Sequence, residues 1–409
     1  MGLFARSRTA AVAVVLSTAA SCVLAAAPAR AADGPGAGEP WVVSVGDSYI
    51  SGEAGRWAGN SDSLLTNPTD TGADAYFDNA DHTAERIPGC HRSKSAEIHL
   101  GGGVRSENLA CSGATTATDA TGAAFKPGID FYQDATGRKG QARMLQEFAA
   151  GHRVKMVALS IGGNDFGFAE VVQKCLTTFV LGVTPYCKND ATVTGKVAPA
   201  EVARLTGAIA GAIDNIHTAM AGAGYADGDY TIVVQNYPGP MRSPAASNNR
   251  YGETYGRQTT GGCGVYNTDI DWLLGTFLTT VNSTVAASIT KAATDHQVTN
   301  TKALNLRTAF DGRTLCEKPV NVIENTDLAT GTSPGAQDKL EWVSQIYTAT
   351  GVLGSHQLQE GLHPDYWGQL ALRNCLRRAY ADGTPQSGTC TRDTAGGTDA
   401  QGEPAMLLG

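Results

Sequence analysis

Residues 41–48 read Trp-Val-Val-Ser-Val-Gly-Asp-Ser, an apolar run rich in valine that ends in a glycine, an acid and a serine. Such a run is typical of a buried strand that leads into a turn. Similar runs follow at residues 154–160 and 230–235, and residues 302–306 can form a fourth strand. The stretches with helical character are residues 141–150, 166–178, 198–221, 270–293 and 366–380. Strands that alternate with helices predict an α/β fold, a three-layer sandwich with a mostly parallel central sheet.

The composition is that of an acidic globular protein. The chain has 409 residues, of which 42% are hydrophobic, and its 49 Gly and 16 Pro are too few for a disordered or collagen-like protein. The formal net charge is −8, and no block of like charge occurs. We therefore expect no nucleic-acid partner and no binding to an anionic membrane surface.

The N-terminus has the layout of a secretory signal peptide. Arg6 and Arg8 precede an apolar run over residues 9–27, and a small-residue pattern ends at Ala31, where we expect cleavage. An N-terminal membrane anchor is the alternative, but the run is rich in alanine and ends at a cleavage-like site. The predicted organisation is a signal peptide at 1–31, a short linker at 32–40, one domain at 41–380 and a polar tail at 381–409 that frays.

The cysteines indicate disulfides. Without Cys22 in the signal peptide, an even number remains, as expected of an exported protein. No two cysteines have the spacing of a zinc site. The polar residues 52–110 then form a long, disulfide-stapled loop. Pairing sequence neighbours predicts the bonds Cys90–Cys111, Cys175–Cys187, Cys263–Cys316 and Cys375–Cys390.

Three polar stretches lie where a parallel sheet places functional loops, beyond the carboxyl ends of strands or just before the last helix. They are Gly-Asp-Ser-Tyr at 46–49, Gly-Gly-Asn-Asp at 162–165 and Glu-Gly-Leu-His-Pro at 360–364. Taken singly, each is as easily a turn or a surface residue. Taken together, they supply a hydroxyl, an amide and an imidazole, which are the groups that nucleophilic catalysis needs.

In this order the three blocks resemble the SGNH or GDSL hydrolases, a family of ester hydrolases. A fourth stretch, Asn-Leu-Ala-Cys-Ser-Gly-Ala-Thr at 108–115, looks like the second block of that family. The cysteine in this block and the disulfide-rich, exported chain look most like the actinomycete lipases and esterases of the family. The resemblance implies the flavodoxin-like SGNH hydrolase fold. The Gly-x-Ser-x-Gly elbow of the α/β-hydrolases is absent, since the last position is Ile50.

The resemblance also implies a role for individual residues. Ser48 becomes the nucleophile and His363 the general base, with an oxyanion hole formed by the N–H of Ser48, the N–H of Gly113 and the side-chain amide of Asn164. The family commonly has an aspartate three residues before the histidine, and here that position is Glu360. We expect Glu360 to orient His363, and a backbone carbonyl is the alternative.

The function that follows is that of a secreted serine ester hydrolase which forms an acyl-enzyme on Ser48. We expect a lipase or phospholipase A type of activity, and the alternatives are a carbohydrate acetyl esterase and a secreted binding module without turnover. We expect a monomer that acts on a small-molecule or lipid ester, with no cofactor, no metal and no stable membrane anchor. The residues that favour an acyl channel are apolar or aromatic and lie beside the blocks: Tyr49, Ile50, Trp57, Phe166, Phe168 and Trp367.

Overall fold

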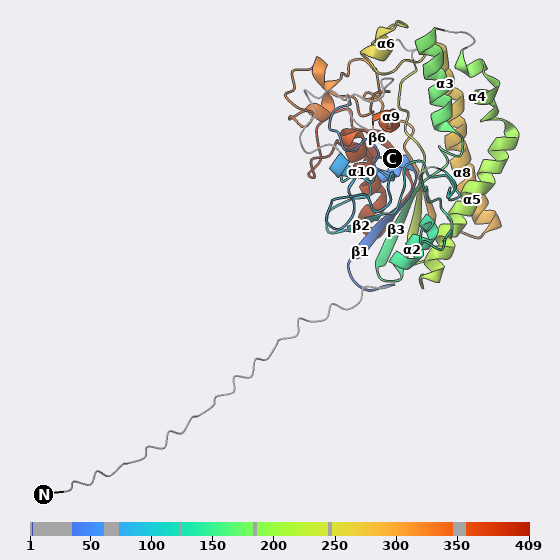
Figure 1. The fold of residues 1–409 in the computed structure, drawn as a ribbon, viewed down its shortest axis with the longest axis vertical. Helices are drawn as coiled ribbons and strands as arrows, with labels where there is room; N and C mark the ends of the chain where they lie inside the picture. The colour runs from blue at the N-terminus through green and yellow to red at the C-terminus, as the bar shows by residue number, and fades with distance from the viewer. Residues whose placement is uncertain are drawn as a thin grey trace. The chain divides into compact units, whose positions relative to one another are not determined.

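A seven-stranded sheet forms the centre of the protein, with strand order β2-β1-β3-β4-β5-β6-β7 (Figure 1). This computed structural model describes residues 2, 35–60, 73–122, 124–182, 186–243, 248–346 and 357–409. The predicted cleavage site and nearly all of the predicted signal peptide therefore lie outside the described residues. The strands are β1 (Pro40–Gly46), β2 (Arg105–Asn108), β3 (Arg153–Ser160), β4 (Thr231–Gln235), β5 (Thr301–Asn305), β6 (Gly388–Arg392) and β7 (Met406–Leu408).

Each neighbouring pair of strands is parallel except β6 and β7. The order of the first five strands is that of the flavodoxin-like doubly wound fold, in which the ligand crevice lies at the point between β1 and β3 where the order reverses. The predicted α/β fold with a mostly parallel central sheet is confirmed. Whatever follows β1 and β3 lies at the switch point.

Alternate residues of the strands supply two separate cores, one on each face of the sheet. Val43 and Val45 of β1 belong to a buried cluster shared with helices of one layer, whereas Val42 belongs to the cluster on the other face. The first cluster takes residues from α2 (Gln141–Ala149) and α5 (Pro199–Gly222), and the second takes residues from α10 (Tyr366–Tyr380). The sheet is therefore the middle layer of the predicted sandwich.

The remaining helices lie mainly in the connections between strands. The longer ones are α3 (Phe168–Leu181), α7 (Asn267–Trp272) and α8 (Leu278–Asp295), and a π-helical turn, η4 (Leu273–Phe277), joins α7 to α8. The short ones are α1 (Ser48–Ser51), α4 (Ala191–Gly195), α6 (Gly256–Thr259), α9 (Gln357–Glu360), η1 (Ala73–Tyr76), η2 (Cys187–Asn189), η5 (Ile323–Asn325), η6 (Ala336–Asp338) and η7 (Ala381–Gly383).

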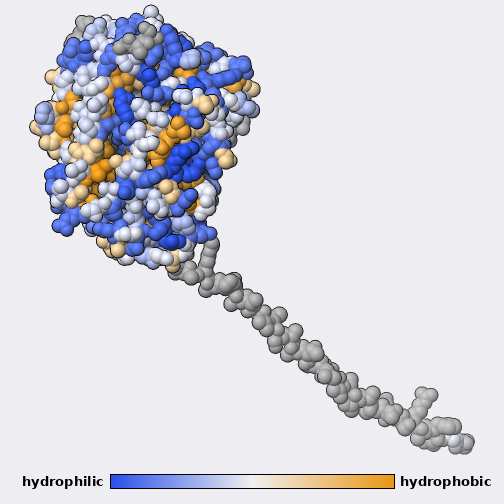
Figure 2. All heavy atoms as spheres, turned by 180° about the vertical axis from the view of Figure 1, so that it is seen from behind, coloured by the Kyte–Doolittle hydropathy of each residue, from blue (hydrophilic) through white to orange (hydrophobic). Residues whose placement is uncertain are grey.

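The helical stretch Asn267–Asp295 is long and apolar enough to cross a membrane, and half of its most apolar window is buried inside the protein. Its α8 part packs along α5, as a helix of a protein core does. Figure 2 shows the face opposite to that of Figure 1, where hydrophobic residues lie in short stripes between hydrophilic ones. A mixed surface of this kind is ordinary for a protein that faces water.

The four predicted disulfides are confirmed: Cys90–Cys111, Cys175–Cys187, Cys263–Cys316 and Cys375–Cys390. The last of them connects α10 to the C-terminal segment. Residues 381–409 differ from the polar, fraying tail that the sequence predicts, because β6 pairs with β5 and β7 pairs with β6. Backbone pairing needs no apolar pattern, and for this reason the composition does not reveal it.

Candidate active site

Ser48 follows β1 in a turn where the ends of β1 and β3 approach each other closely. Gly46 has a φ of +142°, and a Cβ added there would lie 2.1 Å from the carbonyl oxygen of Ser160 at the end of β3. The buried side chain of Gln141 also bonds both the N–H and the carbonyl of Gly46, at 2.7 and 2.9 Å. Only glycine fits this position. The next residue, Asp47, caps α1, and Ser48 is the first residue of that short helix.

The structure brings Ser48 and His363 together across the whole length of the fold. The hydroxyl oxygen Oγ of Ser48 lies 2.7 Å from Nε2 of His363, within hydrogen-bond distance. Both side chains are nearly buried, with 6% and 8% of the residue surface exposed. Two groups that are far apart in sequence thus lie at the distance that a nucleophile and its base need for acyl transfer.

The backbone before His363 is held under strain. Leu362 has a φ of +65°, which is unusual for a bulky residue. Its carbonyl accepts a hydrogen bond of 2.7 Å from the hydroxyl of Tyr49, and the carbonyl of His363 accepts one of 2.9 Å from the N–H of Ser344. The ring of Tyr49 lies 5.1 Å from the imidazole. Tyr49, the neighbour of Ser48, therefore fixes the loop that carries His363.

The side chain of Glu360 does not bond the imidazole. Its carboxylate accepts two hydrogen bonds from Arg56, at 2.6 and 3.0 Å, and one from the hydroxyl of Tyr76 at 2.6 Å. Nδ1 of His363 has no hydrogen-bond partner among the described residues. Only the backbone of Glu360 meets His363, since its carbonyl accepts the N–H of His363 at 3.0 Å. A buried arginine explains the difference, because it draws the carboxylate into an ion pair.

Another carboxylate lies on the Nε2 side of the imidazole. Oε2 of Glu53 is 3.6 Å from Nε2 of His363 and accepts a hydrogen bond of 2.6 Å from the hydroxyl of Ser112. Its other oxygen, Oε1, lies 2.8 Å from Nδ1 of His91. Sequence reasoning missed Glu53 and His91, because both lie in polar stretches without periodicity. The one available signal was the predicted Cys90–Cys111 bond, which puts His91 beside Ser112.

The predicted oxyanion donors lie on three turns near Ser48: Ser48 and Asn164 line the same pocket, and Asn164 contacts the loop that contains Gly113. The N–H groups of Ser48 and Gly113 have no acceptor among the described residues, and the positive φ of +77° at Gly113 suits glycine alone. The side-chain amide of Asn164 donates to the carbonyl of Ala114 at 2.9 Å, which brings it next to the Gly113 loop. These are the donor types that stabilise a developing oxyanion.

The Asn164 turn is fastened to the Gly113 loop a second time. The hydroxyl of Thr116 donates to the carboxylate of Asp165 at 2.7 Å, and the N–H of Thr116 lies 3.1 Å from the same oxygen. Because Asp165 directly follows Asn164, this contact holds the amide beside the loop.

The buried carboxyl of Asp47 directly precedes Ser48 in the sequence. Asp47 accepts hydrogen bonds from the hydroxyl of Tyr237 and from the N–H of Tyr49. Burial raises the pKa of Asp47 to about 7, against the lowering effect of these two donors. The Tyr237 hydroxyl also accepts the N–H of Gly163 at 2.9 Å. Asp47 thus connects the turns after β1 and β3, in keeping with an orienting role.

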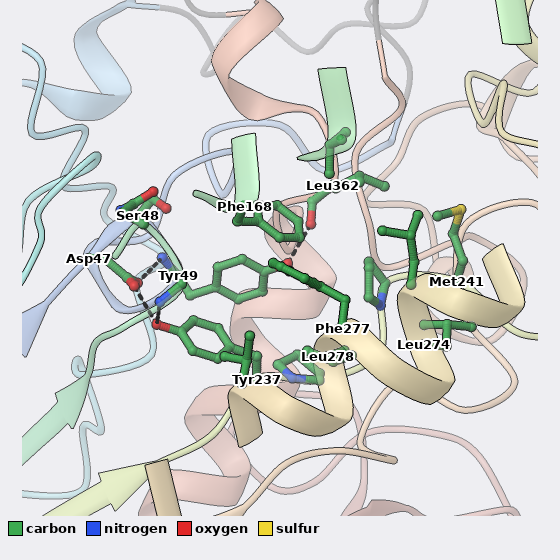
Figure 3. Close-up of a pocket in the computed structure, with 17 residues that line it drawn as sticks. Asp47, Ser48, Tyr49, Phe168, Tyr237, Met241, Leu274, Phe277, Leu278 and Leu362 are labelled. Atoms are coloured by element: carbon green, nitrogen blue, oxygen red, sulfur yellow. Dashed lines mark hydrogen bonds between the residues drawn. The ribbon is translucent and has the colours of Figure 1, made fainter. Parts of the chain in front are cut away.

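A pocket with mostly apolar walls begins at Ser48 (Figure 3). In this view Ser48 lies at one end of the lining, and Met241 and Leu274 lie toward the other. The lining comes from the turns after β1, β3 and β4, from α3, from η4 and α8, and from the residue before His363. Its residues are Asp47, Ser48, Tyr49, Gly163, Asn164, Phe168, Val172, Tyr237, Pro238, Pro240, Met241, Leu273, Leu274, Phe277, Leu278, Val281 and Leu362.

The pocket contains part of the predicted acyl channel. Tyr49 and Phe168 line it, whereas Ile50, Trp57, Phe166 and Trp367 belong to the buried core and not to the lining. No sequence pattern indicated the π turn η4, which supplies Leu273, Leu274 and Phe277. Such turns are rare and are often found at functional sites. Within the described part of the chain, no group of three His, Cys, Asp or Glu is placed to hold a metal ion.

The sequence matches no protein-family model and no curated protein. The structure is similar to an extracellular lipase from Streptomyces rimosus, with 18% identity and a TM-score of 0.42, over 83% of this chain and 99% of that one. It is also similar to phospholipase A1 from Streptomyces albidoflavus NA297, with 17% identity and a TM-score of 0.40, over 83% of this chain and 99% of that one. At such low identity and TM-score, residue roles follow only from the chain's own geometry.

Proposed function

We propose that the chain is a serine ester hydrolase that forms an acyl-enzyme on Ser48 and prefers esters with an apolar acyl chain. The observation that carries this proposal is the hydrogen-bond distance of 2.7 Å between Oγ of Ser48 and Nε2 of His363 at the mouth of an apolar pocket. A serine hydroxyl is a weak nucleophile by itself, and a base within this distance activates it.

In the first half of the reaction, Oγ of Ser48 bonds to the carbonyl carbon of the ester while its proton passes to Nε2 of His363. The electron pair of the carbonyl π bond moves to the carbonyl oxygen. The N–H groups of Ser48 and Gly113 and the amide of Asn164 donate hydrogen bonds to this oxyanion. When the intermediate collapses, the bond to the leaving oxygen breaks, and that oxygen takes the proton from Nε2.

In the second half, water replaces the alcohol. A water proton passes to Nε2 as the water oxygen bonds to the acyl carbon, and a second oxyanion forms in the same place. Collapse breaks the bond between Oγ of Ser48 and the acyl carbon, and Ser48 takes the proton back from His363. The products are a carboxylic acid and the free enzyme.

The walls of the pocket support a lipid ester as substrate. An acyl chain gains about 0.8 kcal/mol for each CH₂ that it buries, so apolar walls reward longer chains. Phe168, Phe277 and Leu278 offer such walls along the pocket that begins at Ser48 (Figure 3). A polar sugar would find few hydrogen-bond partners along this lining, which makes a glycan acetyl esterase the weaker candidate.

Export is part of the proposal. Four disulfides are typical of proteins that fold in an oxidising compartment, and the N-terminal sequence predicts a signal peptide. We propose a secreted monomer without a membrane anchor.

The test is hydrolysis of 4-nitrophenyl esters of graded chain length, a phospholipid, a triglyceride and an acetylated xylan, with Ser48→Ala as the blank. We expect turnover to rise with chain length and to fall roughly 10⁴–10⁶-fold in Ser48→Ala. A fluorophosphonate probe should label Ser48. A folded protein that cleaves no ester and takes no label would be a binding module, and activity confined to acetyl esters would favour the glycan esterase.

A further inference from the structure

A buried cluster of charged and polar groups lies on the Nε2 side of His363, away from the lining of the apolar pocket. Its centre is the carboxylate of Glu53, which is 1% exposed. Oε2 lies 3.6 Å from Nε2 of His363 and 2.6 Å from the hydroxyl of Ser112, and Oε1 lies 2.8 Å from Nδ1 of His91. Among the described residues, Glu53 therefore supplies the carboxylate that contacts the imidazole of His363.

The surroundings of Glu53 keep it ionised. Burial alone would raise the pKa of this carboxyl, but the nearby His363 and the hydrogen bonds from His91 and Ser112 lower the pKa below its usual value. The pKa of His91 is shifted in the opposite direction, upward. Burial would lower the pKa of its imidazole, whereas the hydrogen bond to Glu53 raises the pKa above the usual value. Glu53 and His91 thus form a buried hydrogen-bonded pair, and the other carboxylate oxygen of Glu53 faces the imidazole of His363.

A disulfide holds the two partners of Glu53 in place. The bond between Cys90 and Cys111 joins the residues directly before His91 and Ser112. The N–H of Ser112 also donates to the carbonyl of Cys90 at 3.0 Å. His91 has a φ of +50°, a strained conformation that is frequent at functional sites. Covalent and backbone constraints therefore position a carboxylate that reaches the catalytic base.

The carboxylate of Glu360 does not serve as the partner of the His363 imidazole. Its carboxylate is used by Arg56 and Tyr76, and Nδ1 of His363 lacks a hydrogen-bond partner in the described part of the chain. A positive charge appears on the imidazole when it takes the proton of Ser48. Without a counter-ion, a nearly buried imidazolium is costly. At 3.6 Å, Glu53 supplies the opposite charge.

We propose that Glu53, held by His91 and Ser112, is the positioning residue that stabilises the imidazolium of His363 from its Nε2 side. This inference rests on the proposed ester hydrolysis. Glu53 gains and loses no proton. It stays ionised while the proton moves from Oγ of Ser48 to Nε2 and on to the leaving oxygen. The other titratable groups that act on Glu53 or on its partners are Asp47, Tyr76, Glu85 and Lys126.

The test compares wild type, Glu53→Asp and Glu53→Gln by NMR titration of the His363 ring, assigned with His363→Asn. Removal of the neighbouring negative charge should lower the titration midpoint by about one pH unit or more in Glu53→Gln. Glu53→Asp keeps the charge but moves it away, so its midpoint should fall between the other two. We expect kcat/KM of Glu53→Gln to drop about 10- to 100-fold, part of the ~10²–10⁴-fold that a positioned base contributes. The acid limb of its pH profile should move to lower pH.

The matched control is Glu97→Gln. Glu97 is equally buried and bonds Gln235, and burial raises its pKa to about 8, so the carboxyl is largely neutral at pH 7. An amide there should leave the His363 midpoint and kcat/KM unchanged.

Equal His363 midpoints in wild type and Glu53→Gln overturn the inference, even if the rate falls. If Glu53→Gln does not fold, a Glu53→Asp midpoint at or above that of wild type overturns it. The titration needs no turnover. If the protein has no esterase activity, the proposed function is wrong, and the titration still decides whether Glu53 is coupled to His363.

Discussion

The two sides of Ser48 differ in polarity. On one side, Tyr49, Phe168 and Phe277 form apolar walls that a carbon chain can bury against. On the other side, His363 and Glu53 belong to a network of charges and hydrogen bonds. One side suits binding and the other suits proton transfer. Ser48, the proposed nucleophile, lies at the boundary between the two sides.

Two buried carboxyls sharpen this comparison. Asp47 and Glu53 lie on either side of Ser48 in the sequence, and both are about 1% exposed. The pKa of Asp47 is raised to about 7 by burial, whereas the pKa of Glu53 falls below its usual value despite burial. Asp47 has neutral donors as partners, and Glu53 has two imidazoles. The two carboxyls are equally buried, so the opposite directions of their pKa shifts come from their partners.

The largest expected effect concerns the pH dependence of stability at Asp47. A carboxyl whose pKa is raised in the folded state stabilises the fold below its unfolded pKa of about 4, and this stabilisation is lost as the pH rises through about 7. Asp47→Asn removes the effect. Relative to wild type, the variant should gain roughly 4 kcal/mol of unfolding free energy between pH 4 and pH 8. Urea unfolding at both pH values measures this difference.

Glu53→Gln should show the opposite sign in the same experiment. A lowered pKa means stability that is present above the unfolded pKa and lost as the pH falls through the folded one. The variant should therefore lose less stability than wild type on acidification below about pH 4. Parallel curves for Asp47→Asn and Glu53→Gln would remove the contrast between the two carboxyls.

The next effect concerns the oxyanion hole. Asn164→Ala should lower kcat about 10²–10³-fold with little change in KM, as expected for a donor that acts mainly in the transition state. Steady-state kinetics on 4-nitrophenyl butyrate provide the measurement. Asn215→Ala is the matched control, because the amide of Asn215 also donates to a backbone carbonyl, that of Ile129 at 2.7 Å. A loss of similar size in both variants would mean that Asn164 acts only through the fold.

A bulky side chain on the apolar side should change the choice of substrate. Leu274→Trp adds volume toward the end of the pocket away from Ser48 (Figure 3). Turnover of a dodecanoyl ester should drop by roughly 10-fold or more relative to a butyryl ester, since contacts worth a few methylenes are lost. The same replacement at the exposed Leu181, which is 66% accessible, is the control. An unchanged ratio of the two rates would place the acyl chain elsewhere.

The smallest effect concerns the contact that holds Asn164 beside the Gly113 loop. Thr116→Val removes the hydroxyl that donates to Asp165, and the backbone contact remains. We expect kcat to fall about 2- to 10-fold, the value of one hydrogen bond of ordinary strength. Thr118→Val, which breaks a similar bond to Asp130, should leave kcat unchanged. Equal losses in both variants would speak for general destabilisation.

Sequence patterns were sufficient for the central part of the fold. Three apolar runs became β1, β3 and β4, because strands buried on both faces must be apolar. The fourth predicted run became β5, which is largely exposed and has only Leu304 buried. β2, β6 and β7 were missed, since these short strands carry charged, threonine or tail residues and owe their place to backbone pairing. The disulfides followed from pairing sequence neighbours. Three of them close loops with sequence separations of 12, 15 and 21, whereas Cys263–Cys316 spans 53 residues and several elements.

The candidate site could be predicted only where residues lie in compact motifs. Ser48 and His363 meet as expected, and Asn164 and Gly113 lie on adjoining turns. Glu53 could not be found, because its partners lie 38, 59 and more residues away and no periodicity connects them. The spacing that pointed to Glu360 says nothing about Arg56, whose ion pair draws that carboxylate away from the imidazole.

Because the π turn within the Asn267–Asp295 helix forms part of the pocket wall, the number of residues in this turn affects the width of the pocket. Such a turn holds one residue more than a regular α-helical turn. Deleting that residue would rotate everything after it by about 100°, one step of a helix with 3.6 residues per turn. Leu278 and Val281 would then swing off the pocket wall, although no side chain had been altered. Substrate range could thus change through a shift in helical phase alone.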